Sequence, residues 1–292
     1  MGDFRWVGKS EDGNKVELHR FQGDFFAQEG KGADWLAANR SHLRKAVVVD
    51  LETTGLSSFT DVIIEIGARE VFFTDAGEIA FIGDSVSAFS DPGFPLPPEI
   101  TKITGIRDED LEGQSIDWPK FEALCAGADF LVAHNAAFDK SFLDLKSKSS
   151  RALPWACSLT QVAWDLEGYP SRKLEILAIY HGFFSDAHRA LADVDALVHL
   201  LEFKGREGRA YFAAILENYR KPLVRLIAAN SPFESKDKLK SRGYSWDSER
   251  RYWHRKLPKE KLPTELDWIT SAVYGGNFRG RCEDIPLERN FS

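Results

Sequence analysis

The part of this sequence that most limits how the chain can fold is a short apolar run, Ala46–Val49, that leads directly into Asp50 and Glu52. Four consecutive apolar residues are typical of a buried strand. Side chains alternate along a strand, so Asp50 and Glu52 point the same way, one pleat apart. Two carboxylates placed like this can share hard divalent cations. An isolated Asp-x-Glu is more often a solvated strand end, so this interpretation depends on the rest of the chain.

A second segment repeats the design. Phe130–Ala133 is another short apolar run, and His134–Asn135 after it is typical of a turn. Apolar residues at helical spacing follow from Phe138, which predicts a helix with Asp139 in its first turn. A carboxylate is favourable there because the helix dipole is positive at its N-terminus. Asp139 alone therefore also has an adequate structural explanation.

A third segment combines a histidine with a carboxylate. Apolar residues from Ala190 to Leu201 predict a helix, with His188 just before it and Asp193 near its start. The two residues are five apart, which is about 140° around a helix, so they are not stacked neighbours. If His188 lies in the loop or cap before the helix, both side chains can face one cleft. A lone histidine is more often incidental than catalytic, and only the three segments together favour a catalytic role.

Together these segments contain four carboxylates and one histidine in the order typical of a two-metal phosphodiesterase site. In this respect the chain resembles the DEDD superfamily of 3′→5′ exonucleases, and within it the DEDDh branch, whose third motif carries histidine. Members include the proofreading epsilon subunit of bacterial DNA polymerase III, the Trex enzymes, RNase T and oligoribonuclease. The resemblance covers approximately residues 45–203. It implies an α/β fold, a ribonuclease H-like domain with a central mixed five-stranded sheet flanked by helices.

The resemblance also implies a role for individual residues. It implies two divalent metal ions, Mg²⁺ or Mn²⁺, held by four carboxylates, with His188 as the general base. The carboxylates are Asp50, Glu52, Asp139 and Asp193. The segment 101–106 resembles the family's loop between motifs, which lies near the substrate. The residues expected to contact the substrate are Thr53, Thr54, Leu56, Ile103, His134, Asn135 and Phe138.

The chain extends beyond the resemblance at both ends. Near the N-terminus, Phe4–Val7 and Lys15–Phe21 flank an Asp-Gly turn signal and predict a hairpin. Trp35–Asn39 then predicts a short helix. Three parts are expected: an N-terminal hairpin and helix extension over 1–44, the DEDDh exonuclease domain over 45–205, and a helical linker with a small basic, aromatic-rich unit over 206–292.

The C-terminal part is predicted to form a small α+β appendix. Tyr211–Ile227 reads as helical, a second helix over 233–242 ends at Gly243, and residues 244–255 form a hairpin. The unit weakly resembles an appendix of some bacterial epsilon-like exonucleases. Residues 220–256 contain 11 Lys/Arg and 4 Asp/Glu, so this segment is basic although the chain as a whole has a net charge of −7.

This basic segment has two interpretations. Aromatic side chains interleaved with arginines are what single-stranded nucleic-acid binding uses, and the candidate strand contacts are Arg251, Trp253 and Arg255. The charges are equally explained as a solvated surface. The aromatic residues are also what a small domain needs as a core, and we favour that role for them.

Composition places the chain among cytoplasmic proteins without a membrane partner. No apolar run reaches 18 residues, and the N-terminus has no apolar segment typical of a secretion signal. The three cysteines, Cys125, Cys157 and Cys282, are scattered without metal-ligand spacing, as is usual for reduced thiols.

The predicted function is a metal-dependent 3′→5′ exonuclease that releases 5′-mononucleotides from single-stranded ends by a two-metal mechanism. We prefer DNA over RNA as the partner because the resemblance is strongest to epsilon-like enzymes, and a replication or repair protein is a candidate second partner. Two alternatives remain: a 3′→5′ exoribonuclease similar to RNase T and oligoribonuclease, and a non-catalytic nucleic-acid-binding or tethering module. The presence of all five chemical residues favours an enzyme.

Overall fold

The chain forms two compact units in the computed structural model, which describes residues 9–10, 12–185 and 188–291. The first unit comprises the chain up to Tyr219 together with Phe291, and the second is Arg220–Asn290. The chain therefore passes between the units twice. Within the described residues, no helix combines the length and apolar character needed to cross a lipid bilayer.

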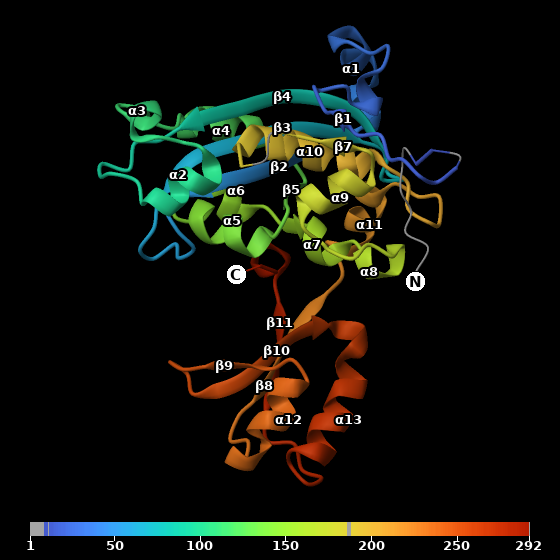
Figure 1. Ribbon diagram of the computed structural model, residues 1–292. Helices are drawn as coiled ribbons and strands as arrows, with labels where there is room; N and C mark the ends of the chain where they lie inside the picture. Colours follow the sequence, from blue (N-terminus) through green and yellow to red (C-terminus); the bar gives the residue numbers. More distant parts are fainter. Residues whose placement is uncertain (1–8, 11, 186–187, 292) are drawn as a thin grey trace. The chain divides into compact units, whose positions relative to one another are not determined.

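A mixed five-stranded sheet forms the centre of the first unit, as the family resemblance implied (Figure 1). Its strand order is β4-β3-β2-β5-β6; β3 is antiparallel to both of its neighbours, β2 and β4, whereas β5 and β6 run parallel to β2. The strands are β2 Arg44–Thr53, β3 Ile63–Phe73, β4 Ile79–Phe89, β5 Phe130–Ala133 and β6 Trp155–Cys157.

Helices cover both faces of this sheet, and the side chains of the helices and strands form one hydrophobic cluster on each face. Along β2, Ala46 and Val48 belong to one cluster, whereas Val47 and Val49 belong to the other. Burial on both faces explains why this strand is a continuous apolar run and not an alternating one. The helices are α2 Pro98–Thr104, α3 Asp108–Leu111, α4 Trp118–Cys125, α5 Ala136–Leu143, α6 Lys148–Ala152, α7 Ser158–Gln161, α8 Trp164–Glu167, α9 Leu174–Tyr180, α10 Ala190–Glu202 and α11 Tyr211–Asn218.

The N-terminal extension is part of the first unit and packs against its core. Lys9 and Val16 form an antiparallel bridge around the predicted Asp-Gly turn, whereas the other predicted hairpin strand, Phe4–Val7, lies outside the described residues. Phe25 is buried in the same cluster as Val48. The elements of the extension are β1 His19–Arg20, which pairs with β7 Phe183–Phe184, then η1 Phe26–Gln28, α1 Ala33–Asn39 and η2 Arg40–His42.

The second unit is a four-stranded antiparallel sheet with helices on one face. The strand order is β11-β8-β10-β9, and β9 and β10 form the predicted hairpin. It has its own hydrophobic cluster. Its elements are β8 Leu223–Ala228, η3 Phe233–Ser235, α12 Lys236–Ser241, β9 Ser245–Asp247, β10 Tyr252–Pro258, η4 Lys259–Lys261, α13 Leu262–Ala272, β11 Arg281–Ile285 and η5 Leu287–Arg289.

Two local predictions were wrong. The helix predicted over Tyr211–Ile227 ends at Asn218, and the following residues form β8. Pro222 separates the two, since a proline disfavours helical backbone in the residue before it. The two units divide after Tyr219. The predicted loop over 101–106 is largely the end of α2, and Gly105 closes that helix with a φ of 72°.

Candidate active site

The end of β2 places both predicted carboxylates on the sheet face that α10 covers. Because side chains alternate, Asp50 and Glu52 continue the row of Ala46 and Val48, which pack in the same cluster as residues of α10. Asp193 lies in the first turn of α10. Asp50 and Asp193 thus come from opposite sides of one helix–sheet contact.

These segments meet in a cleft of about 400 Å³. All five residues predicted to carry out the chemistry line this cleft: Asp50, Glu52, Asp139, His188 and Asp193. Two of the predicted substrate residues, His134 and Phe138, line it as well, as do Lys173 and Glu175. The structure therefore brings three segments that are far apart in the sequence into one site.

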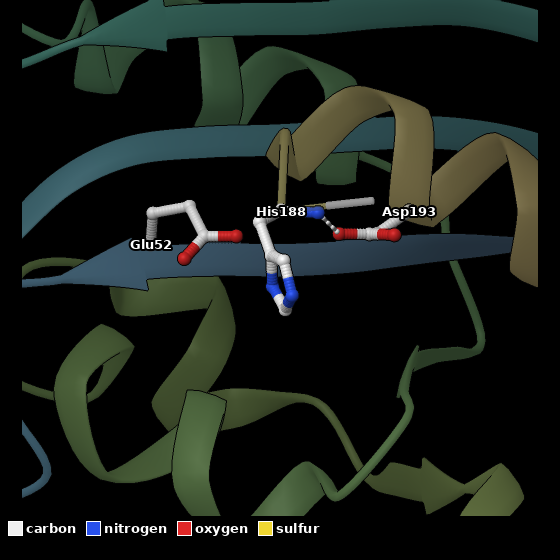
Figure 2. A group of neighbouring side chains, drawn as sticks. All are labelled: Glu52, His188 and Asp193. Carbon is white, nitrogen blue, oxygen red and sulfur yellow. Dashed lines mark hydrogen bonds between the residues drawn. The ribbon is translucent and has the colours of Figure 1, made fainter. Parts of the chain in front are cut away.

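His188 precedes α10 and lies between two carboxylates. Its φ is 66°, in the left-handed region, and its backbone N–H donates a hydrogen bond of 2.8 Å to Oδ2 of Asp193. Figure 2 shows the imidazole between the side chains of Glu52 and Asp193. One ligand atom from each of these three residues lies within 4.8 Å of the other two. His188 therefore lies before α10, which is the position the sequence analysis required for both side chains to face one cleft.

The environment of the cleft raises the pKa values of its four carboxylates when no cation is bound. Burial, followed by the charges of Asp139, Asp193 and Glu52, raises the pKa of Asp50 well above its ordinary value. Burial and the charge of Asp193 raise the pKa of Glu52 to about 8. Burial raises the pKa of Asp139 to about 8 and that of Asp193 to about 6. This repulsion is relieved when positive charge enters the cleft.

The donor set fits divalent cations. Oδ1 of Asp139 is buried and has no hydrogen-bond partner among the described residues. A buried carboxylate oxygen without a partner is costly, and a metal ion or its water would satisfy it. Four carboxylates and no sulfur are the ligands that Mg²⁺ and Mn²⁺ prefer.

The predicted substrate residues fall into two groups. Leu56 and Ile103 are 88% and 55% exposed, which is unusual for apolar side chains without a partner. By contrast, Thr53, Thr54 and His134 have structural hydrogen bonds. The Thr53 hydroxyl donates to the Gly55 carbonyl, the Thr54 hydroxyl accepts from the Val62 N–H, and the His134 ring bonds the Ser158 hydroxyl and the Arg172 carbonyl. Asn135 has a φ of 86° and is the N-cap of α5.

Sequence reasoning missed charged residues at the site. Lys173 and Glu175, at the start of α9, line the cleft. Glu65 on β3 lies opposite Glu52 in the sheet and forms an ion pair with Arg189. A single lysine before a helix and a single glutamate in an apolar strand carry no motif, but the Glu65-Ile66-Gly67 interruption of that strand was a usable signal.

The predicted strand contacts of the second unit are largely engaged within it. Trp253 packs against the core of this unit, and Arg255 forms a 3.0 Å ion pair with the buried carboxylate of Glu265. Arg251 lies in the turn between β9 and β10 with a φ of 57°. The core role favoured for the aromatic residues agrees with the position of Trp253.

Known proteins share the part of the chain that builds this cleft. Residues 47–201 match the model of the RNase T family, described as Exonuclease. A PolC-type DNA polymerase III of Clostridium perfringens is 38% identical over 173 residues, and that of Caldanaerobacter subterraneus subsp. tengcongensis is 42% identical over 164. These alignments cover 54% and 53% of this chain, but only 11% of each polymerase.

Solved structures agree on the fold. An exonuclease I structure superimposes with a TM-score of 0.52 over 77% of this chain and 67% of its own, at 15% identity. A zinc-bound complex of Escherichia coli exonuclease I with single-stranded DNA gives 0.50, 16% identity and the same coverage. With the matched segment spanning more than half of the sequence and containing the whole cleft, the chain belongs to the RNase T exonuclease family, in its DEDDh branch.

Proposed function

We propose that this protein is a metal-dependent 3′→5′ exonuclease that releases 5′-mononucleotides from single-stranded DNA ends. The observation that supports this most directly is the convergence of four carboxylates and His188 in one cleft. An exonuclease domain of this type is shared with PolC-type polymerases. Direction, product and strand preference go beyond that likeness and are our inference.

The residues of the cleft have separate roles in this proposal. Asp50, Glu52, Asp139 and Asp193 hold two divalent cations, Mg²⁺ or Mn²⁺. When bound, such cations neutralise phosphate charge and make water a better nucleophile. His188 accepts the proton of the attacking water, since its ring lies beside Glu52 and Asp193 and its backbone is held by Asp193. The fixed carboxylates and imidazole supply position and charge more than covalent chemistry.

The exposed apolar residues support a single-stranded end as substrate. Leu56 follows Glu52 by four residues and is almost fully exposed. Phe138 lines the cleft beside Asp139. Unpaired bases present apolar faces that stack on or pack against such side chains, whereas bases within a duplex do not. Lys173 adds a positive charge to the cleft wall, suited to a phosphate.

The basic second unit is proposed to bind the rest of the strand, but through a different sheet face than the sequence suggested. In the register of β8 and β10, Arg225 lies beside Lys256, and both alternate with the core residues Leu226 and Leu257. Nε of Arg225 and Nδ1 of His254 are buried and have no hydrogen-bond partner among the described residues. Arg225 and Lys256 repel each other across the sheet, and a phosphate backbone would relieve that repulsion. On its other side Arg225 is paired with Glu283, whose carboxylate forms a 2.8 Å ion pair with Arg281.

Matched DNA and RNA oligomers of one sequence, labelled at the 5′ end, test the substrate preference. In Mg²⁺, the DNA oligomer is expected to be shortened faster than the RNA. The control is Asp84→Ala, which removes an exposed carboxylate of β4 and should change neither rate. Faster degradation of RNA would instead establish the exoribonuclease, and degradation of neither would favour a binding module.

A further inference from the structure

We propose that Glu65 is a positioning residue for the exonuclease reaction: through Arg189 and Ala190 it fixes the start of α10, and with it His188 and Asp193, over the carboxylates of β2. This inference rests on the proposed function of the cleft. It assigns a role to a buried charge of β3 that contributes no metal ligand.

Both oxygens of the Glu65 carboxylate are engaged by the start of α10. The side chain is 2% exposed. Its Oε2 accepts a 3.2 Å hydrogen bond from the backbone N–H of Ala190, the first residue of the helix. Nε of Arg189 lies 3.3 Å from Oε1 and 3.4 Å from Oε2. The first N–H groups of a helix lack partners within it and favour negative charge, so the carboxylate binds where the helix is most receptive.

Gly67 also contacts the start of α10, and we call Glu65 and Gly67 together the seat of this helix. A Cβ at this position would come within 2.3 Å of the backbone C of Ala190 and the backbone N of Leu191. The helix start therefore lies directly on β3, and only glycine leaves room for it. Glu65 and Gly67 are one pleat apart and share a face of the strand. The Glu65 carboxylate thus binds the start of the helix, and the missing side chain at Gly67 leaves room for the helix backbone.

The seat lies in register with the metal-binding strand. Glu65 is paired with Glu52, and Gly67 with Asp50, across the antiparallel β2–β3 contact. Each metal-binding carboxylate of β2 is therefore paired directly with one of the two residues of β3 that support the start of α10. Because Asp193 lies within one turn of Ala190, the seat fixes its separation from those carboxylates.

His188 is positioned by the same contact. It directly precedes Arg189, and its N–H donates to Asp193. The Arg189 guanidinium also lies 5.2 Å from the centre of the Phe89 ring, which holds it from a second side. Loss of the ion pair would leave Glu65 as a buried charge without its cation and free the backbone that carries the histidine.

The test compares two carboxylates of one strand. Glu65→Gln retains an acceptor for the Ala190 N–H but loses the ion pair with Arg189. The control is Glu70→Gln, which breaks the ion pair of a partly buried glutamate with Lys45 five residues along β3, about 16 Å away. Arg189→Gln, at a half-exposed side chain, tests the same contact from the other partner should Glu65→Gln fold poorly. Mn²⁺ affinity by calorimetry, kcat and KM on a short oligomer, and melting temperature are measured for each full-length variant.

Glu65→Gln and Arg189→Gln are each expected to weaken Mn²⁺ binding by about 10–100-fold, as is usual when the support of a metal ligand is removed. The loss should appear in kcat more than in KM, and the double variant should lose little more than either single one. Glu70→Gln should lower the melting temperature and leave Mn²⁺ affinity and kcat unchanged. Wild-type affinity and kcat in both Glu65→Gln and Arg189→Gln would overturn the inference. Mn²⁺ binding by the wild type without any nuclease activity would contradict the proposed function alone.

Discussion

Asp50 and Glu52 are polar residues at the end of a strand whose other inward-facing residues are apolar, and this contrast made the site recognisable from sequence. The same is true of Asp139 and Asp193, each in the first turn of a helix beside an apolar run. Such residues stand out because burial of a charge needs a reason. Lys173 and Glu65 do not stand out, because their partners come from segments distant in the sequence.

The crowded carboxylates predict an unusual pH dependence of stability without metal. The pKa values of Glu52 and Asp139 are about 8 in the fold, above their ordinary values of 4.5 and 3.8. The folded form therefore binds more protons than the unfolded form between these limits, so the free energy of unfolding falls as pH rises through that window. In chelator, the melting temperature should fall by about 5 °C or more from pH 5 to pH 8.

Two comparisons check this origin. Saturating Mg²⁺ should reduce the decrease, because the bound cations neutralise the ionised carboxylates. Glu52→Gln should also reduce it, because one of the titrating groups is removed. A melting temperature in chelator that stays level or rises between pH 5 and pH 8 would show that these carboxylates do not have raised pKa values in the folded protein.

His188 and Asp193 are predicted to differ in kind. His188→Ala should lower kcat by about 10²–10⁴-fold, the usual contribution of a general base. It should weaken Mn²⁺ binding much less than Asp193→Ala does, because the carboxylate is the ligand. Single-turnover rates and calorimetry on the two variants measure the difference. Equal losses of Mn²⁺ affinity in both would mean that His188 acts as a ligand and not as the base.

At the level of helices and strands, the prediction succeeded where residue spacing is strong and local. The strand that leads to Asp50, the helix after the second motif and the β9–β10 hairpin all have clear periodicity or turn signals in the sequence. It failed at β8, where the run Leu223–Ala228 is too short for its period to distinguish strand from helix. Pairing with β10 and β11, which are far along the chain, decides its conformation.

Truncation tests where the first unit ends. Phe212, Ile215 and Tyr219 are buried in the core of the first unit. Burying a large apolar side chain stabilises a fold by about 1.5–3 kcal/mol. A chain of residues 1–221 should therefore unfold cooperatively, whereas 1–205 should be unfolded or aggregate. If the two show the same melting curve, α11 is not part of the core.

For the whole molecule, charge distribution matters more than net charge. The chain is acidic overall, yet the segment that begins the second unit is strongly basic. An acidic nuclease domain can function on a polyanion because cations in the cleft reverse the local field. The role of the second unit could not be predicted residue by residue, because the carboxylate that neutralises Arg255 comes from α13, later in the chain. Arg255 faces Glu265, whereas Arg225 lies on the opposite face.

This placement predicts which charges bind the strand. Replacing Arg225 and Lys256 together by Gln should weaken binding of a long single strand and lower the slope of log affinity against log salt by about 1–2. A dinucleotide, which fills only the cleft, should be cleaved at the normal rate. The control pair, Lys236→Gln with Lys240→Gln on α12, removes the same charge and should leave the slope unchanged. An equal change of the salt slope in both double variants would indicate non-specific attraction. An unchanged slope in both would contradict the proposal that the second unit binds the strand.

The most direct test of the proposed function is the order in which labels leave a single-stranded DNA oligomer that carries different labels at its two ends. In Mg²⁺, the wild-type protein should release the 3′ label first, as a 5′-mononucleotide, and chelator should stop the reaction. Asp50→Ala should release neither label, although its metal-free melting temperature should equal or exceed that of the wild type because repulsion in the cleft is relieved. Release of the 5′ label first, or equal rates for Asp50→Ala and the wild type, would contradict the proposed reaction at this cleft.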